Sequence, residues 1–180
     1  MGALVKARSE RRAVRRAGDG GLRVEYLAFV LAGETYAVQI AHVAEILRPP
    51  PITEVPRAPA TVLGVISVRG KLVTVLDLRR RFALPEGPVD RKTRVLLADA
   101  GGGEQIGLLV DEVQQVWRLS AEEIEPSSVL GGEQPAHIAG IGRPRGALSA
   151  ARSSEAKERA QTPDADILIL LDLRPILESP

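Results

Sequence analysis

The chain has 180 residues and a formal net charge of +1, with 44% hydrophobic residues, 3% aromatic residues and no cysteine. This length and composition predict one domain or two small ones around an aliphatic core, and the lack of cysteine excludes disulfides, thiolate metal sites and cysteine nucleophiles. The longest purely hydrophobic run, residues 26–32 (YLAFVLA), is far shorter than the roughly 20 residues of a membrane-spanning helix. No apolar segment follows the basic N-terminus, so we expect no secretory signal and a cytoplasmic location.

The first 21 residues are predicted to form a basic, flexible tail. Residues 1–20 contain six Lys or Arg and two acidic residues, a net charge of +4 that leaves −3 for the rest of the chain. A basic tail can bind nucleic acid or anionic lipid, but a slightly acidic body is not typical of a nucleic-acid-binding domain. We therefore interpret residues 1–21 as a solvated tail.

From Val24 onward, short apolar runs separated by turn residues predict β-strands. Residues 24–31 and 35–39 flank a Gly-containing loop, a pattern typical of a β-hairpin. In residues 40–47 the apolar positions have helical spacing, which predicts one helical turn that runs into a strand. Prolines 49–51 end this segment, because proline lacks an amide donor.

Two more hairpins are predicted further along the chain, around residues 69–71 and 101–103. The capping-box pattern of residues 120–123 predicts a short helical turn. Residues 143–166 are rich in Ala, Ser, Arg and Pro and predict a mobile insert, because they cannot bury enough apolar surface to offset their ordering entropy. The remaining predicted strands are 62–68, 72–78, 94–98, 105–110, 113–119 and 167–172.

Two segments of the chain occur twice. Residues 73–79 (VTVLDLR) return as residues 168–174 (LILLDLR) at an offset of 95, and residues 36–46 are echoed by residues 106–116 at an offset of 70. The same two elements therefore occur in the same order, with about 25 additional residues in the second copy. Such a repeat indicates that one supersecondary unit was used twice, and it predicts two similar lobes packed together.

Candidate catalytic groups are few. The two histidines, His42 and His137, have no carboxylate at metal-ligand spacing, so we expect no metal site. Asp77 and Asp172 could act as the acid and base of a hydrolase, but each follows an apolar strand at the same place in its repeat, which favours a structural role. Glycines 101–103 precede a predicted strand rather than a helix and so form no phosphate-binding loop. We therefore expect a binding module with no catalytic residue and no cofactor.

Several motifs follow one another in a specific order. They are residues 36–40 (YAVQI), 43–46 (VAEI), a proline-rich stretch to Pro59, 64–70 (GVISVRG), 75–79 (VLDLR), 106–113 (IGLLVDEV), 119–126 (LSAEEIEP), 138–142 (IAGIG) and 171–173 (LDL). Each motif alone is weak, but their order and spacing over about residues 24–178 resemble the CheW family of chemotaxis coupling proteins.

The resemblance implies an all-β fold of two five-stranded SH3-like barrels, packed together with a groove between them and with short helical turns. The CheW-like domain is expected at residues 22–178. Within it we expect the first barrel at about residues 36–90 and the second at about 91–166, with the terminal strands exchanging between the lobes.

The resemblance also implies a non-enzymatic adaptor. It would couple the cytoplasmic tip of a methyl-accepting chemoreceptor to the regulatory domain of a CheA-type histidine kinase, in receptor–kinase clusters and with only indirect contact to the membrane. The residues expected in the receptor-binding groove are Val43, Glu45, Gly64, Arg69, Gly70 and Arg94. The residues expected near the kinase, at the outer end of a barrel, are Ile52, Thr53 and Leu63.

Two further points concern partner choice. Arg94 stands where an apolar groove residue is common in the family, a difference that bears on the choice of receptor. The alternative function is a nucleic-acid-binding small barrel with a basic arm, but such proteins carry stacking aromatics and basic faces. With 3% aromatic residues and an acidic body, this chain offers little of either, and no nucleic-acid partner is expected.

Overall fold

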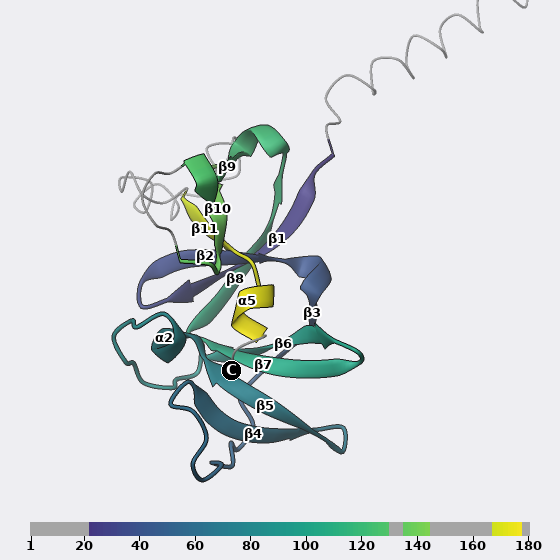
Figure 1. The fold of residues 1–180 in the computed structure, drawn as a ribbon, viewed down its shortest axis with the longest axis vertical. Coiled ribbons are helices and arrows are strands. Elements are labelled where there is room, and N and C mark those ends of the chain that lie inside the picture. The colour runs from purple at the N-terminus through teal and green to yellow at the C-terminus, as the bar shows by residue number, and fades with distance from the viewer. Residues whose placement is uncertain (1–21, 130–134, 145–166, 178–180) are drawn as a thin grey trace, which may run out of the picture.

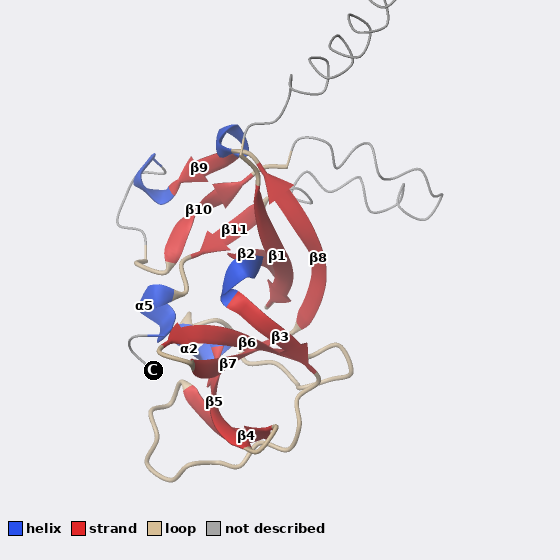
Figure 2. Cartoon of the chain, turned by 90° about the vertical axis from the view of Figure 1, so that its right-hand side faces the viewer, coloured by secondary structure: helices blue, strands red, loops and turns tan. Residues whose placement is uncertain are grey.

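The computed structural model describes residues 22–129, 135–144 and 167–177. These residues are mostly β-strand with a few short helices, arranged as two stacked SH3-like barrels (Figures 1 and 2). The predicted all-β class is therefore confirmed. The predicted tail, residues 1–21, and residues 145–166 of the predicted insert lie outside the described residues.

The upper barrel in Figure 1, here called the terminal barrel, is a six-stranded sheet with the order β8-β1-β2-β11-β10-β9. Its strands are β1 (Val24–Leu31), β2 (Glu34–Gln39), β8 (Glu112–Leu119), β9 (Ile124–Pro126), β10 (Ile138–Gly142) and β11 (Leu168–Leu171). Five strands were predicted for each barrel. The sixth strand here is β9, which is only three residues long and pairs with β10 at the edge of the sheet.

The lower barrel, here called the central barrel, has the predicted five strands in the order β3-β6-β7-β5-β4. They are β3 (Val43–Leu47), β4 (Val62–Val68), β5 (Lys71–Asp77), β6 (Arg94–Gly101) and β7 (Glu104–Val110). The three predicted hairpins, β1–β2, β4–β5 and β6–β7, are all antiparallel pairs.

The described helices are short and lie between strands or after them. They are η1 (Ile40–His42), α2 (Leu78–Arg81), η2 (Ala121–Glu123), η3 (Ser127–Val129) and α5 (Arg174–Leu177). The predicted helical turns before Val43 and after Ser120 correspond to η1 and η2. The turns α2 and α5 were not predicted, because four residues are too few to show helical periodicity.

The chain passes between the barrels at points that differ from the predicted ones. We expected a boundary near residue 90, but β6 and β7 join β3, β4 and β5 in the central barrel, and β2 belongs to the terminal barrel. Two parallel pairings cause this arrangement: β5 lies beside β7, with Thr74 opposite Ile106, and β11 lies beside β2, with Ile169 opposite Tyr36. Each barrel therefore takes strands from both halves of the chain.

The two sheets have the same strand order once the sequence repeat is applied. In the repeat, β2 matches β7 and β5 matches β11, and chain order then matches β1 with β6, β3 with β8 and β10 with β4. Replacing each strand by its match converts the order β8-β1-β2-β11-β10 of the terminal barrel into the order β3-β6-β7-β5-β4 of the central barrel. Even β9 has a counterpart, because Thr53 forms an isolated antiparallel bridge with Val65 of β4. The two predicted lobes are therefore topologically equivalent.

One hydrophobic cluster is shared by both barrels. It joins Phe29 and Val38 of the terminal barrel to Leu76 and Leu108 of the central barrel, and it includes Ile176 of α5. Two smaller clusters lie within the terminal and the central barrel separately. Because the shared cluster buries apolar surface that each barrel alone would expose, the two barrels pack as one unit.

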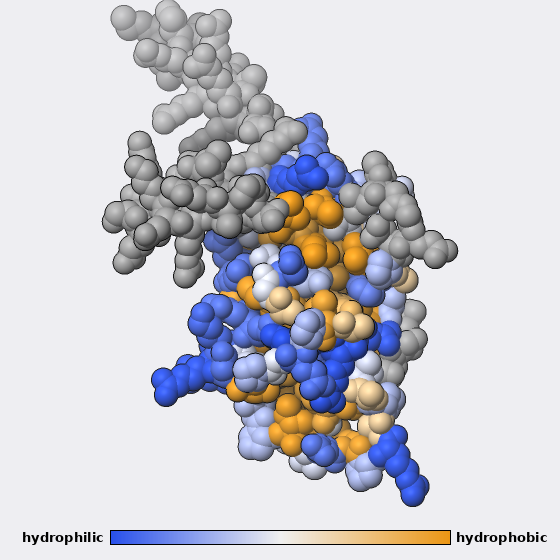
Figure 3. Space-filling model, turned by 90° about the vertical axis from the view of Figure 1, so that its left-hand side faces the viewer, coloured by the Kyte–Doolittle hydropathy of each residue, from blue (hydrophilic) through white to orange (hydrophobic). Residues whose placement is uncertain are grey.

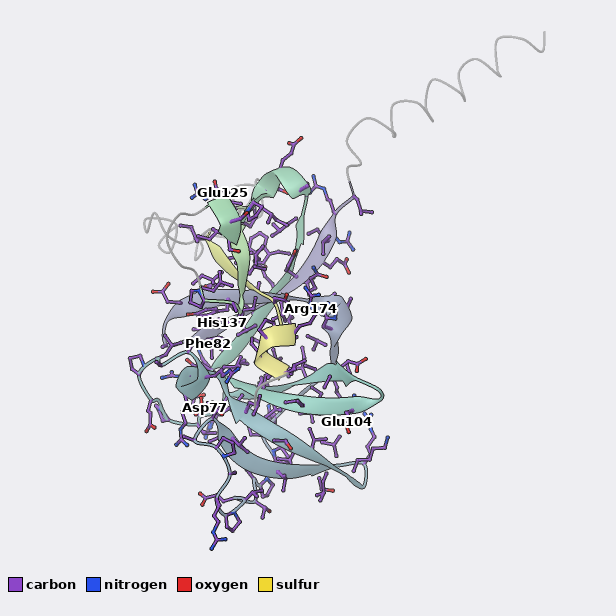
Figure 4. All side chains as sticks on the ribbon, viewed as in Figure 1. Asp77, Phe82, Glu104, Glu125, His137 and Arg174 are labelled. Carbon is purple, nitrogen blue, oxygen red and sulfur yellow. The ribbon has the colours of Figure 1, made fainter. Side chains whose placement is uncertain are left out.

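Four rings form a stack between the barrels. Phe29 and Tyr36 of the terminal barrel have centroids 6.2 Å apart, and Phe82, which follows α2, lies 5.8 Å from Tyr36. The ring of His137 stacks on that of Phe82 with centroids 4.2 Å apart, and Figure 4 labels the two side chains next to each other. Burial lowers the pKa of His137 below its usual value of 6.5, and the nearby charge of Arg81 lowers it further.

Candidate functional site

The two aspartates considered as catalytic carboxylates occupy equivalent structural positions. Asp77 Oδ1 accepts hydrogen bonds from the backbone N–H groups of Arg79 (2.8 Å) and Arg80 (3.3 Å) at the start of α2. Asp172 Oδ1 accepts one from the N–H of Arg174 (3.0 Å) at the start of α5. The Arg174 side chain also donates to Asp172 and is the largest cause that lowers the pKa of this carboxyl. Both aspartates therefore accept backbone N–H groups at the starts of short helices, an arrangement that agrees with the predicted structural role.

Metal ligands and membrane-spanning helices were sought in the same described ranges. No group of three or more His, Asp or Glu side chains in residues 22–129, 135–144 and 167–177 is arranged to hold a metal ion. Among the helices described there, none combines the length and the apolar character that crossing a bilayer requires.

Arg69 lies at the centre of the predicted receptor site. It forms a 2.7 Å ion pair with Glu45 while its side chain stays 78% exposed. Since β3 and β4 are the two edge strands of the central barrel, this pair joins one edge to the turn at the other edge. Arg69 and Gly70 have φ values of +50° and +81°, as a two-residue type I′ hairpin turn requires. The turn therefore displays a charged side chain on a defined backbone.

Val43 lies in the same strand as Glu45, two residues before it. It begins β3 and packs, half-buried, against the hydrophobic cluster shared by the barrels. A β-bulge separates it from Glu45, because Val43 pairs with Ala98 and Glu45 with Leu97. The structure thus brings together Val43, Glu45, Arg69 and Gly70 at one end of the central barrel.

Gly64 lies with the residues expected at the kinase contact. It is buried in β4, and a Cβ placed on it would overlap the Thr53 carbonyl oxygen and approach Ile52 Cγ2 to 2.9 Å. Thr53 exchanges two backbone hydrogen bonds with Val65, of 2.9 and 2.8 Å. The lack of a side chain at Gly64 thus lets the segment that contains Ile52 and Thr53 pack against β4.

Ile52 and Leu63 line the same pocket, which has a volume of about 240 Å³. The exposed Val89 also lines it, together with the polar side chains of Arg79 and Asp111. The side of the molecule that carries α2 has hydrophobic areas separated by hydrophilic ones, as Figure 3 shows. The pocket is therefore of mixed character, with an apolar wall and a charged wall.

The charged wall contains a contact that the sequence analysis did not single out. Arg79 donates from Nε to Asp111 Oδ1 (2.7 Å) and from Nη2 to Asp111 Oδ2 (2.5 Å), a two-pronged arrangement. Asp111 Oδ2 also accepts from the N–H of Ala32 (2.8 Å), in the turn between β1 and β2. These bonds tie the central barrel to the terminal barrel. The sequence repeat that singled out Asp77 and Asp172 could not reveal these bonds of Asp111. The residue equivalent to Asp111 in the other copy of the repeat, at position 41, is an alanine.

Arg94 lies apart from the Glu45–Arg69 pair. It begins β6, and the pairing of Leu47 with Val95 sets it opposite Arg48, three residues beyond Glu45 along the chain. At about 3.3 Å per residue, that places Arg94 on the order of 10 Å from Glu45 along the strand direction. The six residues of the predicted receptor groove thus fall into three places: the Glu45–Arg69 end of the barrel, the buried Gly64, and Arg94.

Comparison with known proteins identifies the family. Residues 25–180 match the family model for the CheW-like domain. The chain belongs to this family. The chemotaxis protein CheW of Klebsiella aerogenes is 35% identical to it over 103 residues, which are 57% of this chain and 61% of the relative. The chemotaxis protein CheW of Helicobacter pylori is 31% identical over 104 residues, which are 57% of this chain and 62% of the relative. The match thus spans about three fifths of the length of these curated relatives.

A solved structure has the same fold. The crystal structure of the scaffolding protein TtCheW from Thermoanaerobacter tengcongensis superposes with a TM-score of 0.69 and 26% sequence identity. The superposition covers 88% of this chain and 94% of that one. The family predicted from the ordered motifs and the two-barrel fold are both confirmed.

Proposed function

We propose that the chain is a non-enzymatic adaptor that couples the cytoplasmic tip of a methyl-accepting chemoreceptor to the regulatory domain of a CheA-type histidine kinase. It would act in the cytoplasm within receptor–kinase clusters and meet the membrane only through the receptors. The observation that carries this proposal is the pair of equivalent barrels packed as one unit, because such a body offers separate surfaces to two protein partners. Membership of the CheW-like family supports the same class of function.

For the receptor, we propose a contact surface around the Glu45–Arg69 ion pair, with Val43 and Gly70 beside it. A non-glycine residue at positive φ costs on the order of 1 kcal/mol. Arg69 nevertheless occupies such a position, and its guanidinium is exposed rather than buried. A strained residue that displays a charge supports a role in binding, because a relaxed Gly or Asn would serve the turn alone.

For the kinase, we propose a contact at the pocket lined by Ile52 and Leu63. Val89, which is 63% exposed, adds apolar surface to the same pocket. Thr53 fixes the position of Ile52 through its two hydrogen bonds to Val65. In this proposal Gly64 is needed for the kinase contact although it does not touch the kinase, because any side chain at Gly64 would displace Thr53.

The two other functions considered receive no support from the described residues. Three of the five aromatic side chains, Phe29, Tyr36 and Phe82, are packed in the ring stack between the barrels, where they cannot stack on bases. Asp77 and Asp172 are held by helix starts and by neighbouring arginines, as expected for structural carboxylates rather than for an acid–base pair.

Charge reversal of the ion pair tests the receptor assignment. We expect Arg69→Glu to reduce capture of a chemoreceptor cytoplasmic fragment while leaving capture of the kinase regulatory domain unchanged. The double variant Glu45→Arg/Arg69→Glu restores an ion pair of reversed direction and is the matched control. It should recover the parental melting temperature but not receptor capture.

The outcomes separate the roles that the pair could have. If the double variant recovers receptor capture, the pair acts only through the fold and the proposed contact surface is wrong. If the parental chain captures neither a receptor fragment nor a kinase regulatory domain from the same organism, the adaptor function itself is wrong.

A further inference from the structure

The loop that joins α2 to β6 forms part of the wall of the pocket proposed for the kinase. Residues 82–93 contain no helix or strand, and in Figure 1 they curve past α2 on their way to β6. Residues 86–89 line the pocket of about 240 Å³ together with Ile52 and Leu63. Val89 adds an apolar side chain that is 63% exposed. The shape of the pocket therefore depends on how this loop is held.

The backbone of the loop gives this wall little support of its own. Within the described residues, no backbone–backbone hydrogen bond involves residues 85–89. Pro85 and Pro88 have no amide donor at all. An ion pair of 3.4 Å joins Arg80 to Glu86, but Glu86 is 76% exposed, and exposed pairs contribute little. Side chains from elsewhere in the fold therefore decide where this wall lies.

The guanidinium of Arg79 supports the loop directly. Its Nη1 donates to the Pro85 carbonyl oxygen at 2.7 Å. A Cβ placed on Gly87 would overlap the same guanidinium, so the backbone of Gly87 lies against it. The φ of Gly87 is not positive, and close approach alone calls for glycine at this position. The Arg79 side chain, only 18% exposed, thus serves as a surface on which the loop rests.

The other two nitrogens of this guanidinium bind Asp111. Nε and Nη2 donate to its two carboxylate oxygens. Asp111 lies between β7 and β8, where the chain leaves the central barrel for the terminal barrel, and it also accepts from the N–H of Ala32. All three nitrogens of Arg79 are therefore engaged, which fixes the plane of the group. One rigid group holds both the loop and the terminal barrel.

We propose that Arg79 is a positioning residue for the kinase contact: it keeps Val89 in the wall of the pocket and, through Asp111, ties this wall to the terminal barrel. The inference rests on the proposed function for the identity of the partner. Arg79 acts on the loop rather than on the kinase, because a loop that is already held loses less conformational entropy when a partner binds. Lysine is no substitute here, since its one nitrogen does not reproduce the planar fork.

A nitroxide label tests whether Arg79 holds the loop. The chain has no cysteine, so Glu86→Cys provides a single labelling site in the loop. Adding Arg79→Lys should narrow the electron paramagnetic resonance spectrum of this label, because the loop then moves more freely. Arg118→Lys is the matched control: Arg118 also pairs with one carboxylate, that of Glu25 at 2.8 Å, but on the terminal barrel. It should leave the spectrum unchanged.

A double-mutant cycle tests whether Arg79 acts through Val89. At a temperature where every variant is folded, Arg79→Lys should weaken binding of a kinase regulatory domain about tenfold in the parent. In Val89→Ala, where the side chain that the loop presents is already shortened, the same change should cost about threefold or less. Asp111→Asn should also weaken binding, because an amide offers one acceptor oxygen to the two N–H donors of Arg79.

Four results would overturn all or part of the proposal. Equal spectra with and without Arg79→Lys would show that Arg79 does not hold the loop. Equal losses in the parent and in Val89→Ala would show that Arg79 touches the kinase itself or acts only through global stability. Parental affinity of Asp111→Asn would remove the tie to the terminal barrel. If the parent binds no kinase regulatory domain, the adaptor function is wrong; a narrower Arg79→Lys spectrum would then keep the support of the loop and overturn its assignment to the kinase.

Discussion

Gly64→Ala changes a position where both the backbone and the surrounding atoms require glycine. Gly64 has a φ of +148°, a conformation that side chains of L-residues rarely adopt. A Cβ there would overlap the Thr53 carbonyl oxygen and lie 2.8 Å from the Thr53 carbonyl carbon. Because these are backbone atoms, they cannot move aside by a rotamer change. The variant must therefore shift the segment that bridges to Val65.

The expected loss of stability has two parts. Backbone strain at such a position costs about 1–3 kcal/mol. Displacing Thr53 also breaks or weakens its two hydrogen bonds with Val65, each with a net contribution of about 1 kcal/mol. Together these effects amount to about 4 kcal/mol. For a protein of this size, that corresponds to a fall in melting temperature of about 8–16 °C.

Two other glycines separate the strain from the steric overlap. Gly33 has a φ of +92°, and no atom lies within 4 Å of the position that a Cβ would take there, so Gly33→Ala tests backbone strain alone, at about 1–2 kcal/mol. Gly140 is the counterpart of Gly64 in β10, and a Cβ on it would overlap the Glu125 carbonyl oxygen without a positive φ. Gly140→Ala therefore tests the overlap alone. Circular dichroism melting of the three variants should rank Gly64→Ala as the least stable.

A melting temperature of Gly64→Ala equal to that of Gly33→Ala would refute this reasoning, because it would mean that Thr53 does not pack on Gly64. A functional consequence is also expected. Ile52 and Thr53 are expected to move in this variant. At a temperature where the variant is still folded, it should therefore capture the kinase more weakly than the parent and capture the receptor equally well.

Arg79→Lys removes the two-pronged contact with Asp111 and is expected to lower the unfolding free energy in urea by about 1–2 kcal/mol; an unchanged value would mean that the tie between the barrels does not stabilise them. His137→Phe keeps the ring stack on Phe82 but removes the titrating group. The pKa of His137 in the folded chain is lower than its usual 6.5, so at pH values between these two pKa values the unfolded chain binds more protons than the folded chain. The unfolding free energy of the parent therefore falls as the pH falls through this range. The His137→Phe variant should lose less stability than the parent between about pH 7.5 and pH 5.5. An equal fall of the melting temperature in both proteins over this pH range would contradict the prediction. Deleting residues 145–165 should change stability by about 1 kcal/mol or less, since β10 and β11 already pair at Gly142 and Leu168; a collapse of the melting temperature would show that the insert packs on the terminal barrel.

Local patterns in the chain were sufficient to locate most strands and both aspartate positions. Apolar runs between turn residues predicted β1 and β2, and turn residues predicted the turn at Arg69 and Gly70. Such features could be predicted because they depend only on neighbouring residues. The repeat predicted two equivalent lobes and a structural role for Asp77 and Asp172. The short helices α2 and α5 left no such pattern, although α2 begins one residue after Asp77 and α5 begins two residues after Asp172.

The pairing of distant strands was decided only in three dimensions. The parallel pairs β5–β7 and β2–β11 join segments from different copies of the repeat, and no local signal distinguishes this exchange from pairing within one copy. The same holds for the site, because Gly64 lies against Thr53 and Arg79 binds Asp111 in the other half of the chain. The physical reason is that burial of the apolar cluster shared by both barrels selects the pairing, and this burial depends on all of its residues at once.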